Sequence, residues 1–157
     1  MQQPGAMVLR RVAAMFRENP GSWSQGFFGV LPGGVAIGED PGYETIKRMT
    51  AMCIDIAIVK IGMPLGGTQV VDEARRMFCN RRGMPHTRKA IWEYNDADGR
   101  SIEQVITTLE DAAAYGDGSR SCGPEFESAQ PAANPVTHAY VDDCAVKAVA
   151  LALNVQM

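Results

Sequence analysis

The densest group of charged side chains in this chain is a run of cations between residues 75 and 89. Its members are Arg75, Arg76, Arg81, Arg82, Arg88 and Lys89. No acidic residue occurs between Ala74 and Trp92. Cations grouped in this way can hold the phosphates of a nucleotide or a nucleic acid. They can equally interact with the free carbonyl groups at the C-terminal turn of a helix, or with an acidic surface of a neighbouring protein.

Two short segments add aromatic rings and amides. Gln25 follows Trp23, and Tyr94 and Asn95 follow Trp92. Aromatic faces can stack on a flat ligand while amides orient it, so these residues are candidates for lining a pocket for an anionic, nucleotide-like molecule. The alternative is that the rings belong to the edge of the core and that their polar tips find partners there.

The sequence Asn95-Asp96-Ala97-Asp98-Gly99 invites comparison with a calcium-binding loop. If Gly99 is the sixth residue of an EF-hand loop, Tyr94 stands where an acidic or amide ligand is needed and Val105 stands where a glutamate is needed. A type I turn that leads into a helix explains the same residues.

The side chains that could catalyse a reaction are few. Cys79 and His86 are the only hint of a nucleophile with a nearby base, and a buried helical cysteine is the alternative. No sequence pattern typical of serine hydrolases, zinc proteases or phosphate-binding loops is present. The four cysteines, Cys53, Cys79, Cys122 and Cys144, are far apart in sequence, which favours free thiols and argues against a metal site. No cofactor is expected.

Charge is distributed unevenly along the 157 residues, a length typical of one domain. Residues 1–90 hold 12 Lys/Arg and 7 Asp/Glu, whereas residues 91–157 hold 3 and 11. Such asymmetry suggests a surface for polyanions or two surfaces that meet in self-association. The net charge of −3 and the lack of a recognised motif argue against nucleic acid.

The chain shows no apolar run of about 18 residues, so no membrane span is expected. Arg10 and Arg11 interrupt the N-terminal apolar stretch and argue against a signal peptide. We therefore expect a cytoplasmic protein.

The elements that must position these residues are mostly helices. Apolar periodicity predicts a helix over 7–18, and a hairpin or a pair of extended arms over 23–37, interrupted by Pro32-Gly33-Gly34. A helix is predicted over 43–61, although residues 53–61 also alternate as a strand would. A loop is expected over 62–67. A further helix should begin with Thr68 as its cap and stop at Gly83 and Pro85.

The segment from Ala90 is predicted to be an extended aromatic run that enters a turn at 96–99. An amphipathic helix should begin at Ser101, where Ser101 and Gln104 can form a capping box. Gly116 is expected to end this helix.

From residue 7 to residue 115 the chain resembles DUF6197, a family of small bacterial and phage proteins of unknown function. The resemblance rests on Trp23-Ser24-Gln25-Gly26, on the run Cys53 to Ile58, on Tyr94-Asn95-Asp96, and on Arg100 to Val105. Tyr94 replaces a tryptophan of the family pattern, Gln104 replaces a glutamate and Ile56 replaces a glycine. The resemblance implies a mostly helical fold and no assigned activity.

The C-terminal part differs in composition. Residues 116–136 read as a linker or extended arm, and residues 137–157 as a helix that is apolar almost all round. Such a helix packs either in the core of the domain or against a neighbouring subunit. The candidate interface residues are Tyr140, Val141, Cys144, Ala148 and Leu151.

Taken together, the sequence predicts a mostly α (α+β) protein, with a helical domain over 1–115, a short β-hairpin or extended element and an additional C-terminal helix. The leading functional hypothesis is a non-catalytic binding or assembly protein that self-associates, plausible as a phage accessory or structural protein. The alternative is a binder of small anionic molecules, and the third is a small enzyme.

Overall fold

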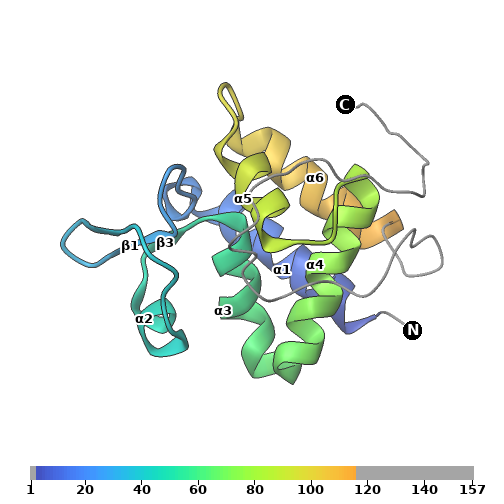
Figure 1. The fold of residues 1–157 in the computed structure, drawn as a ribbon, viewed down its shortest axis with the longest axis horizontal. Helices are drawn as coiled ribbons and strands as arrows, with labels where there is room; N and C mark the ends of the chain where they lie inside the picture. The colour runs from blue at the N-terminus through green and yellow to red at the C-terminus, as the bar shows by residue number, and fades with distance from the viewer. Residues whose placement is uncertain (1–2, 116–157) are drawn as a thin grey trace.

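The helices of the domain surround one apolar core. The structure is a computed structural model that describes residues 3–115. Helix α1 (Pro4–Glu18) packs against α3 (Ile54–Gly66), α4 (Thr68–Arg82) and α6 (Ile102–Tyr115). A small sheet lies to one side of these helices (Figure 1). The predicted class, mostly α with a small β element, is confirmed. The predicted linker over 116–136 and helix over 137–157 lie outside the described residues.

Helix α1 begins three residues earlier than predicted, with a proline in its first turn, where the missing N–H costs nothing. The predicted apolar face is correct, because Val8, Val12 and Phe16 are all fully buried. Gly5 marks the contact with α4: a Cβ atom there would lie 2.8 Å from Glu73 Cγ.

The sheet confirms the predicted hairpin. Strand β1 (Gly29–Leu31) pairs antiparallel with β2 (Val35–Ile37) and, on its other side, with β3 (Ala51–Met52), giving the order β2-β1-β3. A short 3-10 helix, η1 (Pro20–Ser22), precedes Trp23, which forms a parallel bridge with Met52. The sheet thereby fixes the start of the Trp23–Gly26 segment.

The prediction of one helix over 43–61 followed by a loop is wrong. The segment contains α2 (Tyr43–Arg48), then β3, then α3, which continues to Gly66. Helix α3 carries no clear apolar stripe because most of its faces are buried. Gly62 does not start a loop; it lets α4 approach, since a Cβ atom there would lie 2.9 Å from Val71 Cγ2.

Helix α4 ends as predicted. Gly83 adopts φ +68° and its N–H donates to the carbonyl of Asn80, so it closes the helix in the left-handed conformation. The predicted cap at the start is wrong: Gly67 holds the cap position, and Thr68 is the first helical residue.

The aromatic run is helical, not extended. Helix α5 (Arg88–Asp96) is capped by Thr87, whose Oγ1 accepts from Ala90 N at 3.2 Å. Ile91, Tyr94 and Asn95 are buried at helical spacing, which explains why a segment of strand-forming residue types forms a helix.

The turn that follows lies one residue later than predicted. Arg100 N donates to Ala97 O, and Gly99 has φ +79°, which a type I turn does not have at its third position. The predicted capping box is confirmed: Gln104 N donates to Ser101 Oγ, and Ser101 N donates to Gln104 Oε1. Gly116, the predicted stop, lies outside the described residues.

Candidate functional site

The Trp23–Gly26 segment is attached to the C-terminal end of α5. Trp23 Nε1 donates to Asn95 Oδ1 at 2.7 Å. Gln25 Nε2 donates to the backbone carbonyl of Asn95 at 2.9 Å, and the N–H of Gly26 donates to Asp96 Oδ1 at 3.0 Å. Two of the segments singled out in the sequence therefore form one unit.

Asn95 is the centre of this unit, which we call the Asn95 network. Its Oδ1 accepts from the indole N–H of Trp23 and also from Ile54 N, the latter at 3.0 Å. Its Nδ2 donates to the carbonyl of Ser24 at 2.9 Å and to Asp96 Oδ1 at 2.8 Å. The buried amide thus uses both donors and accepts twice, as a buried polar group must if it is not to cost stability. It joins α3, α5 and the Trp23–Gly26 segment.

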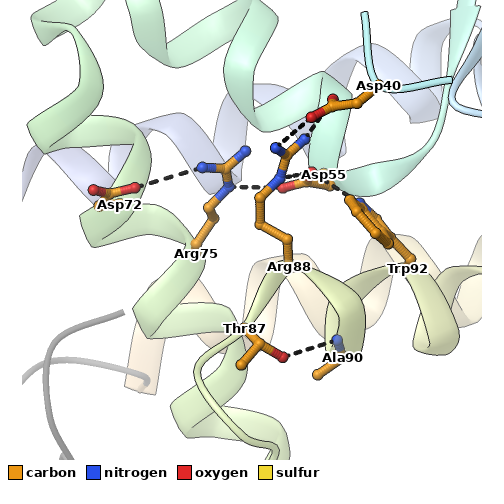
Figure 2. A network of polar contacts seen from close by, with 8 residues as sticks. All are labelled: Asp40, Asp55, Asp72, Arg75, Thr87, Arg88, Ala90 and Trp92. Atoms are coloured by element: carbon orange, nitrogen blue, oxygen red, sulfur yellow. Dashed lines mark hydrogen bonds and ion pairs between the residues drawn. The ribbon is translucent and has the colours of Figure 1, made fainter. Parts of the chain in front are cut away.

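A second polar centre, the Asp55 network, lies at the other end of α5 (Figure 2). Asp55 is fully buried in the first turn of α3. Its Oδ1 accepts from Arg75 Nε at 2.7 Å, and its Oδ2 accepts from Arg88 Nε at 2.8 Å and from Trp92 Nε1 at 3.0 Å. A carboxylate at such a depth is tolerated because it is paired and hydrogen-bonded.

Two further carboxylates complete the Asp55 network. Arg88 donates to both oxygens of Asp40, at 2.8 and 2.9 Å, and Arg75 contacts Asp72. Burial alone would lower the pKa of Arg88, but hydrogen bonding to Asp40 and attraction to Asp55 raise that pKa above its ordinary value. Two guanidinium groups and three carboxylates thus meet in this network.

A small pocket opens where the two networks meet. Its volume is about 110 Å³, and its lining consists of Gly26, Phe27, Phe28, Gly38, Cys53, Trp92 and Asp96. The Phe28 and Trp92 rings meet edge to face with centroids 5.1 Å apart. Phe27 is 49% exposed, and the carboxylate of Asp96 is exposed as well. We call this the Trp92 pocket.

The two thiols of the described domain are internal. Burial, together with the negative charge of Asp55, raises the pKa of Cys53 to about 12. Burial also raises the pKa of Cys79 far above its ordinary value. His86, the suggested base, has its Nε2 2.7 Å from Asn80 Oδ1. Both thiols are therefore held in the unreactive protonated form at neutral pH.

The structure places the predicted basic run largely on acids of the same domain. Arg75 and Arg88 belong to the Asp55 network, Arg81 pairs with Asp111, and Lys89 pairs with Glu93. Arg82 lies over the ring of Tyr94, with 5.4 Å between its guanidinium carbon and the ring centroid.

Part of the charge asymmetry along the chain is thus balanced inside one molecule. Arg81 on α4 meets an acid of α6, and so does Arg17 on α1, which pairs with Glu110. A role of the basic run in binding an anion stays a prediction.

The two predicted aromatic groups have different surroundings. Trp92 lines the pocket, whereas Tyr94 is 7% exposed, packs edge to face on Phe78 and shares a hydrogen bond with Thr108. Trp23 has its polar tip on Asn95. The candidate interface residues Tyr140, Val141, Cys144, Ala148 and Leu151 lie outside the described residues.

Sequence reasoning missed Asp55, Asp96 and the Phe27-Phe28 pair. Asp55 had a local signal: it is an acid in an otherwise apolar run, and a buried acid needs a partner. Asp96 was considered only as part of a calcium-loop comparison and of the family motif, and Phe28 had no signal, because the segment before the hairpin brings them together by its contacts with α5.

Two further observations concern residues 3–115. None of their helices has the length and apolar character required to cross a bilayer. No three of their histidine, cysteine, aspartate or glutamate side chains come close enough together to hold a metal ion.

Comparison with known proteins places the chain in a family without assigning it an activity. No curated protein and no solved structure matches the chain. Residues 1–115 match a family of unknown function, DUF6197, over a range that agrees with the suspected resemblance. Since that match covers well over half of the chain and includes both polar networks and the pocket, the protein belongs to the DUF6197 family.

Proposed function

We propose that this protein is a non-catalytic binding protein that self-associates. The observation that carries the proposal is the contrast between its reactive and its exposed groups. Asp55 and Cys79 are buried and serve the fold, whereas Phe27 and the Trp92 pocket are open to a partner. A surface of this kind suits recognition, because exposed aromatic side chains beside a concave site are typical of binding surfaces.

Self-association is supported by the sequence of the C-terminal part. Between Ala139 and Val155 the only charged residues are Asp142, Asp143 and Lys147. The helix predicted from this composition would need apolar cover on several sides, and an identical subunit is a source of such cover. A phage-associated accessory or structural role, in the host cytoplasm or in the virion, is the setting that we propose from the family resemblance.

Native mass spectrometry of the untagged full-length protein tests the proposal, because it reports subunit number and retained small molecules together. We expect an oligomer without a retained small molecule. A variant that lacks residues 137–157 should be a monomer and should keep the helical circular dichroism of the remaining domain. A monomeric full-length protein would contradict self-association. A small molecule retained on each subunit would instead favour the predicted small-ligand binder.

A further inference from the structure

We infer that the Trp92 pocket receives the cationic end of an arginine or lysine side chain from a partner protein. The inference rests on the proposed binding function and names the chemistry that this site would recognise. Three features of the pocket carry it: its charge, its aromatic lining and its size.

The charge of the pocket is negative. The exposed carboxylate of Asp96 lies at its wall, held by hydrogen bonds from Gly26 N and Asn95 Nδ2 to Oδ1. Behind Trp92, the fully buried carboxylate of Asp55 accepts a hydrogen bond from the indole N–H of that ring at 3.0 Å. Burial is the main cause of the raised pKa of the wall residue Cys53, and the negative charges of Asp55 and Asp96 add to it. A cation is the guest that such a site favours.

The aromatic lining suits the same guest. Cations are attracted to the faces of aromatic rings, most strongly to tryptophan. Trp92 already takes part in one such contact, since the guanidinium carbon of Arg88 lies 5.2 Å from its ring centroid. Phe27 and Phe28 add further ring surface at the pocket. The site therefore resembles the aromatic cages that bind ammonium groups, with Asp96 supplying the opposite charge.

The size of the pocket points to a side chain and not to a large ligand. A cavity of about 150 Å³ holds one benzene molecule, and the Trp92 pocket measures about 110 Å³. A guanidinium or ammonium group fits this space, but the chain that bears it must lie outside. Phe27, half exposed, offers an apolar surface for the methylene groups of that chain.

Nuclear magnetic resonance titration of the full-length protein tests the inference. The probe is a five-residue peptide with arginine at its centre and alanine elsewhere, acetylated and amidated to remove terminal charges. We expect saturable shifts of the Gly26 amide and the Trp92 indole N–H. The same peptide with citrulline, which has the shape of arginine without its charge, should bind at least about tenfold more weakly because a charged hydrogen bond is lost. Equal binding of the citrulline peptide would overturn the inference.

Three variants of the protein sharpen the test. Asp96→Asn keeps the Oδ1 that accepts from Gly26 and Asn95, and it should weaken binding of the arginine peptide about tenfold. Asp98→Asn removes an acid that is also exposed but does not line the pocket, and it should leave the affinity unchanged. Phe27→Ala should weaken the binding of the arginine peptide more than it weakens the binding of methylguanidinium. An unchanged affinity in Asp96→Asn, or equal loss in both acid variants, would overturn the inference.

The source of the cation is decided in the same titrations. Methylguanidinium lacks the chain that would contact Phe27, so it should bind more weakly than the peptide. If methylguanidinium binds as tightly, the guest is a free small cation and the inference of a partner side chain is wrong. The oligomeric state from mass spectrometry is independent of these results, so the proposed self-association can hold or fail separately.

Discussion

Trp23 and Asn95 are 72 positions apart in the chain, yet a 2.7 Å hydrogen bond joins the indole N–H of the first to the side-chain carbonyl of the second. The bond attaches the segment before the hairpin to the last turn of α5. Trp92, one turn earlier on the same helix, is bonded to Asp55 of α3. Helix α5 is therefore held by polar contacts along its length, and the Trp92 pocket lies between the elements that hold it.

The stability of the fold should depend on the hydrogen-bonding groups of the Asn95 amide and not only on the shape of the side chain. Asn95→Asp replaces the Nδ2 donor by an oxygen that faces two other oxygens, the carbonyl of Ser24 and Asp96 Oδ1. We expect the free energy of unfolding to fall by about 3 kcal/mol, measured by urea denaturation at neutral pH. Asp98→Asn, an exposed exchange of the same two residue types, should change it by less than about 0.5 kcal/mol. Similar effects of the two variants would contradict the role given to the Asn95 network.

Asp55 should be the most sensitive charged residue of the domain. Asp55→Asn keeps the shape of the side chain but removes the negative charge that lies 2.7 Å from Nε of the buried Arg75. A buried pair broken from one side costs about 3–5 kcal/mol, and we expect a loss of that order in chemical denaturation. Asp72→Asn is the matched control, because Asp72 contacts the same arginine from a position that is 35% exposed. The Asp72→Asn variant should lose less than about 1 kcal/mol of its free energy of unfolding.

The sequence could predict those elements whose apolar residues fall on one face. Helix α1 and helix α6 have such a face, and the capping box at Ser101 is a local signal that depends only on residues three apart. Helix α3 could not be delimited in this way, because it is buried on most sides and carries no amphipathic period. Its Gly62 looks like a loop residue until the neighbouring helix is known.

The candidate site was less predictable than the fold. The partners of Asp55 are 20, 33 and 37 positions away, and no local spacing encodes such contacts. The same holds for Arg81, whose acid partner is 30 positions away on another helix. A run of cations in the sequence looks like an exposed surface, although Arg75 and Arg88 point to a carboxylate inside the domain.

The capping box of α6 gives a prediction on local stability. Ser101→Ala removes the hydroxyl that accepts from Gln104 N, and should cost about 1 kcal/mol. For a domain of this size that loss lowers the melting temperature by about 4 °C, measurable by circular dichroism. Thr107→Ala, on the exposed face in the middle of the same helix, should leave the temperature unchanged or raise it, because alanine favours helix. An equal decrease in both variants would contradict the cap.

The internal thiols predict a distinct pH dependence. In a Cys122→Ser/Cys144→Ser variant, only Cys53 and Cys79 remain to react with a disulfide reagent. The thiolate is the reactive form, so the native protein should react at least about 100-fold more slowly at pH 8 than the denatured protein. The denatured rate should level off above the ordinary thiol pKa of about 8.5. The native rate should still rise at pH 10, because the pKa of Cys53 is about 12. If the reaction rate of the native protein levelled off near pH 9, at least one of the two thiols would be accessible and have an ordinary pKa, which would contradict the prediction.

The close approach of α3 and α4 at Gly62 can be tested by a double-mutant cycle. In an open helix, Gly→Ala stabilises by about 1 kcal/mol. At Gly62 the added Cβ would lie 2.9 Å from Val71 Cγ2, a branched side chain that is itself buried and cannot move away freely. Overpacking of this kind costs about 1–3 kcal/mol, so Gly62→Ala should destabilise the protein in urea denaturation.

Val71→Ala removes the obstructing methyl group and leaves a cavity that the new Cβ partly fills. The double variant should therefore lose less stability than the sum of the two single variants, by about 1 kcal/mol. Additive losses would mean that the two helices do not meet at this glycine.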